Sequence, residues 1–490
     1  MVRKALFWSF TGNGATMLVT FAGSIVIARL LTPREMGIYA VAMATIGIVQ
    51  LFTAFGVGSY VIRETDLTPR KLDAAFTVNL VLSIALAAAI FLLGRFGAFL
   101  LSEPSIASVL QLLAITPILG ALGFRPSAML QRQLQFRGAS IIGVICTIIT
   151  TVGTIVAALL GASYMSPAYG SLVSSIVGTV LITAIGREHF GLRLSIYEWR
   201  KITSFGVRIM SISGVSNAAF RLSDIVIGHS LGLAALGLYS RATNLSNMIF
   251  GNIYAPLTRV VFSQLSGAQR DGDRVTEVFL RGFRIIVAFV GPIMLGVAVL
   301  ANPLILLIYG EQWTGAALPL SLILVGQFIS LTFAMNWELF VVRDELKIQT
   351  RLEITRSVFM VASKAIGGMF SLVAAAATTI VDAFFSLALY GRHMPRLARV
   401  RQRRLLVIYG ESLLLSLTAV LPCLVIMIAH GFSDRTPFLQ IMPAMTLGVL
   451  GWLALLYRLD HPLWEEILRL LHQGLAGVRQ ARRDASEPTP

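Results

Sequence analysis

Long apolar runs separated by short polar segments extend along almost the whole chain. Each run has about 20 residues, which is enough for an α-helix to cross roughly 30 Å of hydrocarbon. Dividing the chain at segments rich in charge, proline and glycine gives fourteen predicted membrane spans. They cover residues 5–31, 37–61, 74–100, 106–124, 139–160, 166–186, 205–229, 236–261, 283–308, 316–341, 353–370, 372–391, 405–429 and 437–457.

Composition supports this pattern. The 490 residues are 56% hydrophobic and only 13% charged, and the mean hydropathy is +0.78. Soluble domains carry about a quarter charged residues. We therefore predict an all-α, polytopic membrane protein. Both cysteines, Cys146 and Cys423, fall within apolar spans, so neither a disulfide framework nor a thiolate metal site is predicted.

The net charge of +16 is unevenly distributed. With fourteen spans both termini lie on one side, and the loops on that side hold most of the 40 basic residues, whereas the other side has only Arg34, Arg95 and Arg435. The positive-inside rule makes the basic face cytoplasmic. Topology and anionic lipid headgroups then account for the charge, and no nucleic-acid partner is expected.

Two segments 200 residues apart resemble each other, ARLLTPREMGIYA at 28–40 and GHSLGLAALGLYS at 228–240. This repeat predicts two parallel six-helix lobes. The predicted domains are an N-lobe (1–203), a C-lobe (204–404), two additional helices (405–458) and a tail (459–490). The tail is predicted to be a cytoplasmic amphipathic helix, capped by Asp460 and lying on the membrane interface, followed by disordered residues. The identities in the repeat are Leu31 and Leu231, Gly37 and Gly237, and Tyr39 and Tyr239.

Several function classes are excluded by what the sequence lacks. It has no G-x-x-x-x-G-K-[ST] loop, so ATP-driven pumping by this chain alone is not expected. The predicted external loops are at most about eight residues long, which leaves no room for a catalytic domain. The polar segments hold neither paired carboxylates nor metal-ligand spacing. We therefore expect no enzyme, no cofactor and no metal site.

The 205–229 span is the least apolar and carries both an arginine and an aspartate. Asn217, Arg221, Asp224 and Gly228 follow one another at steps of four, three and four, so they share one helix face. A charge at mid-membrane costs roughly 2.5–3.5 kcal/mol, so it faces protein or a wet cavity. Arg221 is the candidate substrate contact, with Asn217 beside it, and Asp224 is its partner or a coupling site. The alternative is a purely structural ion pair.

Lys364 is another cation within a predicted span, and no carboxylate lies within a turn of it. Small and hydroxyl-bearing residues share its face, which suits a hydrated cavity open to an anion. The alternative is an ion pair across helices with Asp382 or Glu338, which are also candidate coupling sites. For Glu338 we expect one continuous helix over 316–341, with Gln327 and Ala334 on the same face.

The first span carries a polar stripe that includes Asn13 and Thr16. It is the repeat partner of the 205–229 span, so we predict that both helices line a shared cavity and that these two residues contact substrate. Arg29 lies near the external end of this span. It is either a cation of the outer cavity or an interfacial anchor.

The same N-terminal region carries a family resemblance. The stretch SFTGNGATMLVTFAGSIVIARLLTPREMGIYAVAMATIGIVQLFTAFGVGSYVIRE contains A-R-L-L-T-P-x-E-x-G-x-Y at 28–39, F-x-x-x-G at 52–56, and the charged end Arg63-Glu64. It resembles the polysaccharide transporter family, the oligosaccharide flippases of the superfamily that also holds multidrug exporters and lipid II flippases. The resemblance covers essentially the whole chain.

The resemblance implies two helical bundles around a cavity that opens alternately to either side of the bacterial inner membrane. The implied substrate is an undecaprenyl-pyrophosphate-linked oligosaccharide, flipped for exopolysaccharide, capsule or O-antigen biosynthesis. Implied partners are membrane lipids, a polysaccharide polymerase and chain-length or export proteins, and H⁺ or Na⁺ is the possible coupling ion. The alternatives are a cation-coupled multidrug exporter of the same fold, and a scaffold within a polysaccharide assembly complex.

Overall fold

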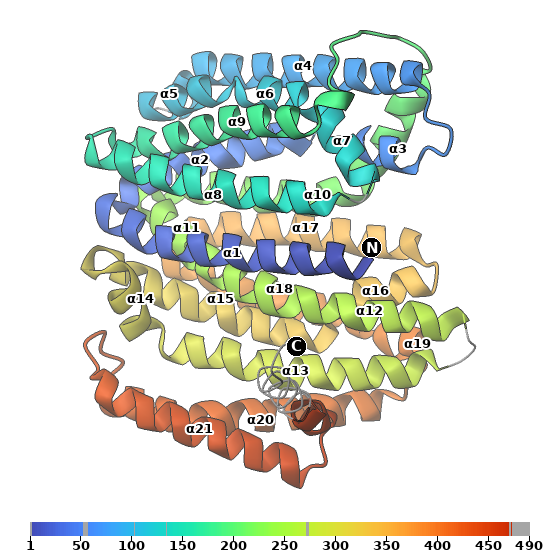
Figure 1. The fold of residues 1–490 in the computed structure, drawn as a ribbon. Helices are drawn as coiled ribbons and strands as arrows, with labels where there is room; N and C mark the ends of the chain where they lie inside the picture. Colours follow the sequence, from blue (N-terminus) through green and yellow to red (C-terminus); the bar gives the residue numbers. More distant parts are fainter. Residues whose placement is uncertain are drawn as a thin grey trace, which may run out of the picture. The chain divides into compact units, whose positions relative to one another are not determined.

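The computed structural model describes residues 2–51, 57–101, 103–133, 135–270, 274–469 and 472, and its regular structure in these residues is entirely helical (Figure 1). The F-x-x-x-G motif at 52–56 and the end of the tail lie outside the described residues. In chain order the elements are α1 (Val2–Leu30), α2 (Pro33–Leu51), α3 (Val57–Arg63), α4 (Pro69–Leu101), α5 (Pro104–Leu113), α6 (Thr116–Leu122), α7 (Phe124–Arg132), α8 (Phe136–Leu159), η1 (Ser163–Met165), α9 (Ser166–Ile185), η2 (Arg187–His189), α10 (Trp199–Leu231), α11 (Leu233–Ile249), the π-turn η3 (Phe250–Tyr254), α12 (Ala255–Arg270), α13 (Val275–Val299), α14 (Ala301–Tyr309), η4 (Glu311–Ala316), α15 (Ala317–Ser330), η5 (Leu331–Phe333), α16 (Asn336–Val342), α17 (Leu346–Gly368), α18 (Leu372–Gly391), α19 (Met394–Ala398), α20 (Gln402–Ala429) and α21 (Phe438–Arg458).

Among the described residues, ten segments are long and apolar enough to cross a membrane. The remaining four predicted spans, 37–61, 205–229, 236–261 and 353–370, are also helical where they are described, as α2 with α3, α10, α11 with α12, and α17. Three of these four carry charged side chains, on α10, α11 and α17. The helices that carry Arg221, Asp224 and Lys364 are thus less apolar than these ten segments.

Two compact units make up the chain. The first contains Met1–Arg241, Ile308–Ala316 and Glu353–Thr378, and the second contains Ala242–Leu307, Ala317–Leu352 and Thr379–Pro490. These boundaries differ from the predicted lobes because the whole of α10 packs against α2, α3 and α4, and part of α17 belongs with them. The division into lobes at 203 and 404 stays a prediction.

In the first unit, α8 packs against α1 and α9, while α4 lies along α5 and α6 (Figure 1). Small residues allow the close approach of α1 to α8, since Gly12 faces Ser140 and Gly23 faces Thr151. In the second unit, α13 packs against α12, α15 and α20, and α20 packs against α21.

The motif at 28–39 is explained by local structure at the start of α2. Thr32 caps the helix and Glu35 reaches back to it, because the Thr32 amide donates to Glu35 Oε2 over 2.7 Å and the Glu35 amide donates to Thr32 Oγ1 over 3.3 Å. This is a capping box, with proline at the first helical position. Ser163 also donates to Glu35, and Tyr39 is 3.1 Å from the Ser171 hydroxyl.

A reciprocal contact joins the starts of α2 and α11. A Cβ at Gly37 would lie 1.8 Å from the Leu233 carbonyl oxygen, and a Cβ at Gly237 would lie 1.8 Å from the Pro33 carbonyl oxygen. The two halves of this contact are related by the offset of 200 residues seen in the sequence repeat. Glycine is required at both places because no side chain fits between the two backbones.

The 316–341 region differs from its prediction. The continuous helix expected there is wrong, because α15 ends at Ser330 and α16 begins at Asn336 after Met335 with φ +62°. The freed Met335 amide donates to the Tyr254 hydroxyl over 3.1 Å, which compensates for the lost helical hydrogen bond. Gln327 and Glu338 therefore lie on separate helices, and Gln327 accepts a hydrogen bond from Ser246 over 2.7 Å.

The tail after α21 also differs in detail. Residues 462–469 are helical, as predicted, but His461 rather than Asp460 caps them, since the Leu463 amide donates to His461 Nδ1 over 3.2 Å. Leu463 is buried with Ala288, Leu415 and Leu456. The apolar stripe of this helix therefore packs against α13, α20 and α21. Trp464 and Ile467 join that packing.

We predict that Gly37→Ala and Gly237→Ala each destabilise the protein by about 1–3 kcal/mol, as overpacking does, because the new methyl group would overlap a backbone carbonyl. Thermal unfolding of the purified protein measures this. Gly143→Ala in α8 is the control, since nothing lies within 4 Å of its added Cβ. Equal unfolding temperatures for the Gly37 and Gly143 variants would contradict the contact.

We also predict that acid loosens the tail helix. Burial, together with the nearby Arg284 cation, lowers the pKa of His461 to about 4, below its ordinary value of about 6.5. Packing of helix 462–469 against α13, α20 and α21 is therefore most stable above pH 6.5 and weakens as pH falls toward 4. His461 binds a proton more readily when this helix is detached, and protonated Nδ1 cannot accept the hydrogen bond from the Leu463 amide.

Amide hydrogen exchange of residues 462–469, corrected for its intrinsic pH dependence, measures this loosening. His461→Asn keeps a capping acceptor that does not titrate, so its protection should change little between pH 7.5 and about pH 5. Unchanged protection of the parent protein over that range would show that His461 does not control docking.

Candidate functional site

The charged face of α10 lies in the first unit and packs against α2. Asn217 and Arg221 are exposed, Asp224 is half-buried and Gly228 is buried. Arg221 lies along Gly47 of α2, where an added Cβ would come within 2.6 Å of Arg221 Nε. The glycine therefore makes room for the arginine side chain, and Arg221 keeps an accessible guanidinium.

Lys364 of α17 is almost fully buried, with 4% of its surface exposed. Its Nζ donates to the Ala375 carbonyl of α18 over 2.9 Å and lies 5.4 Å from the centre of the Tyr239 ring. Asp224 of α10 is attracted electrostatically to Arg221 and Lys364. The structure thus brings three predicted site residues from α10 and α17 into one charged group, which we call the α10–α17 cluster: Arg221, Asp224 and Lys364.

The structure also shows a second group of polar contacts on α10 and α17 that was not predicted. Glu353, at the cytoplasmic end predicted for α17, accepts a hydrogen bond from Ser216 of α10 over 2.7 Å and pairs with Arg356 over 3.2 Å. Glu353, Arg356 and Lys364 lie at helical spacing on α17, which is the signal the sequence offered. Glu353 is therefore bound by groups outside the α10–α17 cluster, and within that cluster two cations are matched by one carboxylate.

A further buried cation of the first unit is Arg241, which is 5% exposed. Its guanidinium carbon lies 5.1 Å from the Tyr309 ring centre and 4.9 Å from that of Trp313. Trp313 Nε1 and Gln312 Nε2 each donate to the Ala28 carbonyl over 2.6 Å, so η4 caps the end of α1. Arg241 therefore has a structural role in holding this cap.

The remaining predicted residues lie outside the α10–α17 cluster. On α1, Asn13 and Arg29 are exposed and Thr16 is half-buried, and the described packing of this helix is with α8. Asp382, buried on α18, and Glu338, half-buried on α16, belong to the second unit. Their roles in binding or coupling, and the ion pair of Lys364 with either of them, stay predictions.

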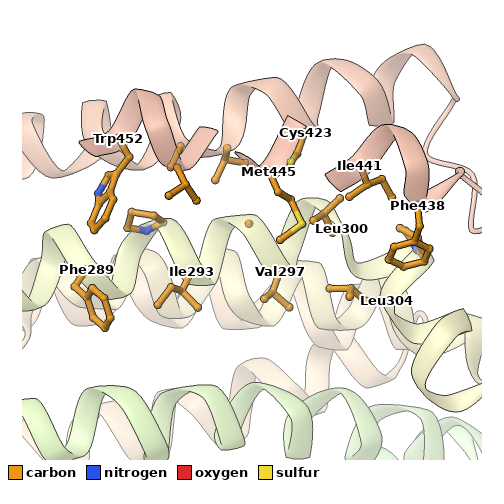
Figure 2. A pocket seen from close by; sticks show the side chains of 16 residues that line it. Phe289, Ile293, Val297, Leu300, Leu304, Cys423, Phe438, Ile441, Met445 and Trp452 are labelled. Carbon is orange, nitrogen blue, oxygen red and sulfur yellow. The ribbon is translucent and has the colours of Figure 1, made fainter. Parts of the chain in front are cut away.

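Within the second unit, α13 and α14 enclose an apolar cavity of about 420 Å³ with α20 and α21 (Figure 2). Phe289, Ile293 and Val297 point into it from α13, and Met445 and Trp452 from α21. The indole N–H of Trp452 is bound to the Ala288 carbonyl over 3.2 Å. A hydrocarbon chain suits these walls, whereas a sugar or phosphate does not.

The sequence matches a known protein family and several curated relatives. The model of the family described as "Polysaccharide biosynthesis protein" matches residues 26–318. The lipopolysaccharide biosynthesis protein WzxC of Escherichia coli K12 is 23% identical over 73% of this chain and 74% of its own length. The succinoglycan biosynthesis transport protein ExoT of Rhizobium meliloti 1021 is 23% identical over 64% of each chain.

Solved structures share the fold. The lipid II flippase MurJ in an inward closed conformation superposes with a TM-score of 0.75, at 13% identity, over 92% of this chain and 98% of the other. An inward-facing multidrug resistance transporter of the MATE family gives a TM-score of 0.60, at 15% identity, over 78% and 96%. The chain is a polytopic membrane protein that belongs to the polysaccharide biosynthesis protein family, and its resemblance to the polysaccharide transporters is thereby confirmed.

Proposed function

We propose that this chain flips undecaprenyl-pyrophosphate-linked oligosaccharide units across the bacterial inner membrane by alternating access, with both termini in the cytoplasm. The observation that carries the proposal is the α10–α17 cluster, in which Arg221 and Lys364 outnumber the single carboxylate of Asp224. A pyrophosphate needs cationic donors, and arginine is the side chain best suited to bind phosphate oxygens in pairs.

The apolar cavity of the second unit supports the same proposal, since its walls suit a polyprenyl chain. Membership of a polysaccharide biosynthesis family supports a glycan as the transported group. The pathway would then be exopolysaccharide, capsule or O-antigen assembly, with the polymerase and the chain-length or export proteins as partners.

A cation-coupled multidrug exporter is the alternative. A site for cationic drugs needs carboxylates free to attract them. In the first unit Asp224 is instead attracted to two cations, and Glu353 is bound by Arg356 and Ser216. This charge balance favours an anionic substrate. Asp224 is the residue of the cluster best placed to couple transport to H⁺ or Na⁺.

We predict that Arg221→Ala and Lys364→Ala each slow flipping of a lipid-linked oligosaccharide in proteoliposomes by roughly 10- to 100-fold. Exposed Arg221 would lose a charge-assisted hydrogen bond to the pyrophosphate, worth about 1.5–3 kcal/mol, and buried Lys364 would lose its electrostatic attraction for the same group. Arg95→Ala, at an exposed arginine of α4, is the control and should flip normally. Thermal unfolding checks that the variants are folded. Survival of flipping in both variants, with loss of cationic-drug efflux, would favour the exporter.

We further predict that flipping depends on an ion gradient. Collapsing the proton and sodium gradients in turn in the same proteoliposomes should slow transport in one of the two cases. Asp224→Asn, which removes the charge and keeps the shape, should abolish the dependence. Unchanged flipping under both conditions would rule out antiport.

A further inference from the structure

The first unit also contains a polar cavity of about 490 Å³. None of its lining residues belongs to the α10–α17 cluster. The cavity is within the size range of about 300–1,000 Å³ typical of small-molecule sites. Six helices supply its walls: α2, α3, α4, α6, α7 and α9. We call it the neutral pocket, because its described lining carries amides and hydroxyls but no charged side chain. The polar lining residues are Gln50, Asn79, Ser83, Thr116, Ser127, Gln131 and Ser175.

Four polar side chains of this pocket are in segments apolar enough to cross a membrane, and one of them is Thr116, in the segment Pro104–Leu122. Asn79 and Ser83 are one turn apart on α4, and Ser175 is on α9. Ser83 is only 4% exposed. Leaving such a group without a hydrogen bond in hydrocarbon costs several kcal/mol. Their position therefore requires hydrogen-bonding partners.

The described part of the chain does not supply those partners. The side chains of Asn79, Ser83 and Ser175 form no hydrogen bond with another described residue, whereas the nearby Thr116 hydroxyl donates to the Leu113 carbonyl over 2.7 Å. Gln131 donates to Ser127 over 3.3 Å. One amide and two hydroxyls thus remain available to a ligand in the pocket.

The chemistry of the lining identifies the class of ligand. An asparagine amide both donates and accepts, as hydroxyls do, and this matches the hydroxyls of a sugar. Phe124 adds an apolar ring against which the C–H face of a pyranose can pack. A phosphate, a uronic acid or a metal ion is disfavoured, because no lining side chain is charged and the described residues contain no group of three metal-ligating side chains.

We propose that the neutral pocket is a subsite for an uncharged sugar residue of the transported glycan. The proposal rests on the proposed function, since the ligand is part of the same substrate. Ser127 and Gln131 lie between the predicted spans 106–124 and 139–160, in a segment expected on the cytoplasmic side, so the subsite would be accessible during substrate loading. The charged cluster then binds the phosphates and the neutral pocket binds part of the glycan.

Saturation-transfer NMR on the full chain in lipid nanodiscs tests this. Maltoside detergents are avoided because they carry sugars themselves. The probes are glucose, galactose and N-acetylglucosamine, with glucuronate as the charged comparison. We expect transfer to at least one neutral sugar and at least tenfold weaker binding in Asn79→Leu and Ser83→Ala, a loss of the size that missing hydrogen bonds produce.

Thr154→Val on α8 is the matched control, since this buried hydroxyl binds the Thr150 carbonyl of its own helix and does not line the pocket. It should bind sugar like the parent, and thermal unfolding should show all three variants folded. Three results would each overturn the subsite. They are equal sugar binding in the parent and both pocket variants, glucuronate binding as strong as that of the neutral sugars, and no binding of any neutral sugar.

The two proposals fail in distinguishable ways. If sugar binding maps to Asn79 and Ser83 but reconstituted protein does not flip a lipid-linked oligosaccharide, the transport function is wrong and the sugar site stands. If flipping occurs and neither pocket variant changes sugar binding, the function stands and the subsite is wrong.

Discussion

The Lys364 ammonium organises the first unit. A lysine at mid-membrane costs roughly 2.5–3.5 kcal/mol, which is comparable to the free energy of one charge-assisted hydrogen bond plus a cation–π contact. Lys364 has both, to the Ala375 carbonyl and the Tyr239 ring, and Asp224 adds an electrostatic attraction. One cation therefore links α10, α11, α17 and α18. Any movement of these helices has to leave the Lys364 ammonium with polar or aromatic partners.

Hydropathy and charge placement predicted the helices. They also indicated Arg221, Asp224 and Lys364 as candidate site residues, because a charge within an apolar run is visible in the sequence alone. The same reasoning missed the bond from Ser216 to Glu353 and the aromatic contacts of Arg241, since these partners are far apart in sequence. It also missed the break between α15 and α16. Nothing local marks that break, because Tyr254, which compensates for it, lies 81 residues away.

The neutral pocket shows a further limit of sequence reasoning. Asn79 and Ser83 barely lower the hydropathy of α4, which is still apolar enough to cross a membrane. Neutral polar residues become informative only when helices from distant parts of the chain bring several of them together. The first unit then offers a charged cluster and an uncharged pocket, and the second unit offers an apolar cavity.

The contact of Gly37 with Leu233 and of Gly237 with Pro33 is made between backbones, with no flexible side chain that could stretch as the helices separate. Both halves join the same two short segments, 33–37 and 233–237, so one half cannot open far without straining the other. The contact therefore behaves cooperatively: both halves are closed or both are open, and a state with only one intact is strained. Such a junction would make separation of these helix ends abrupt rather than gradual.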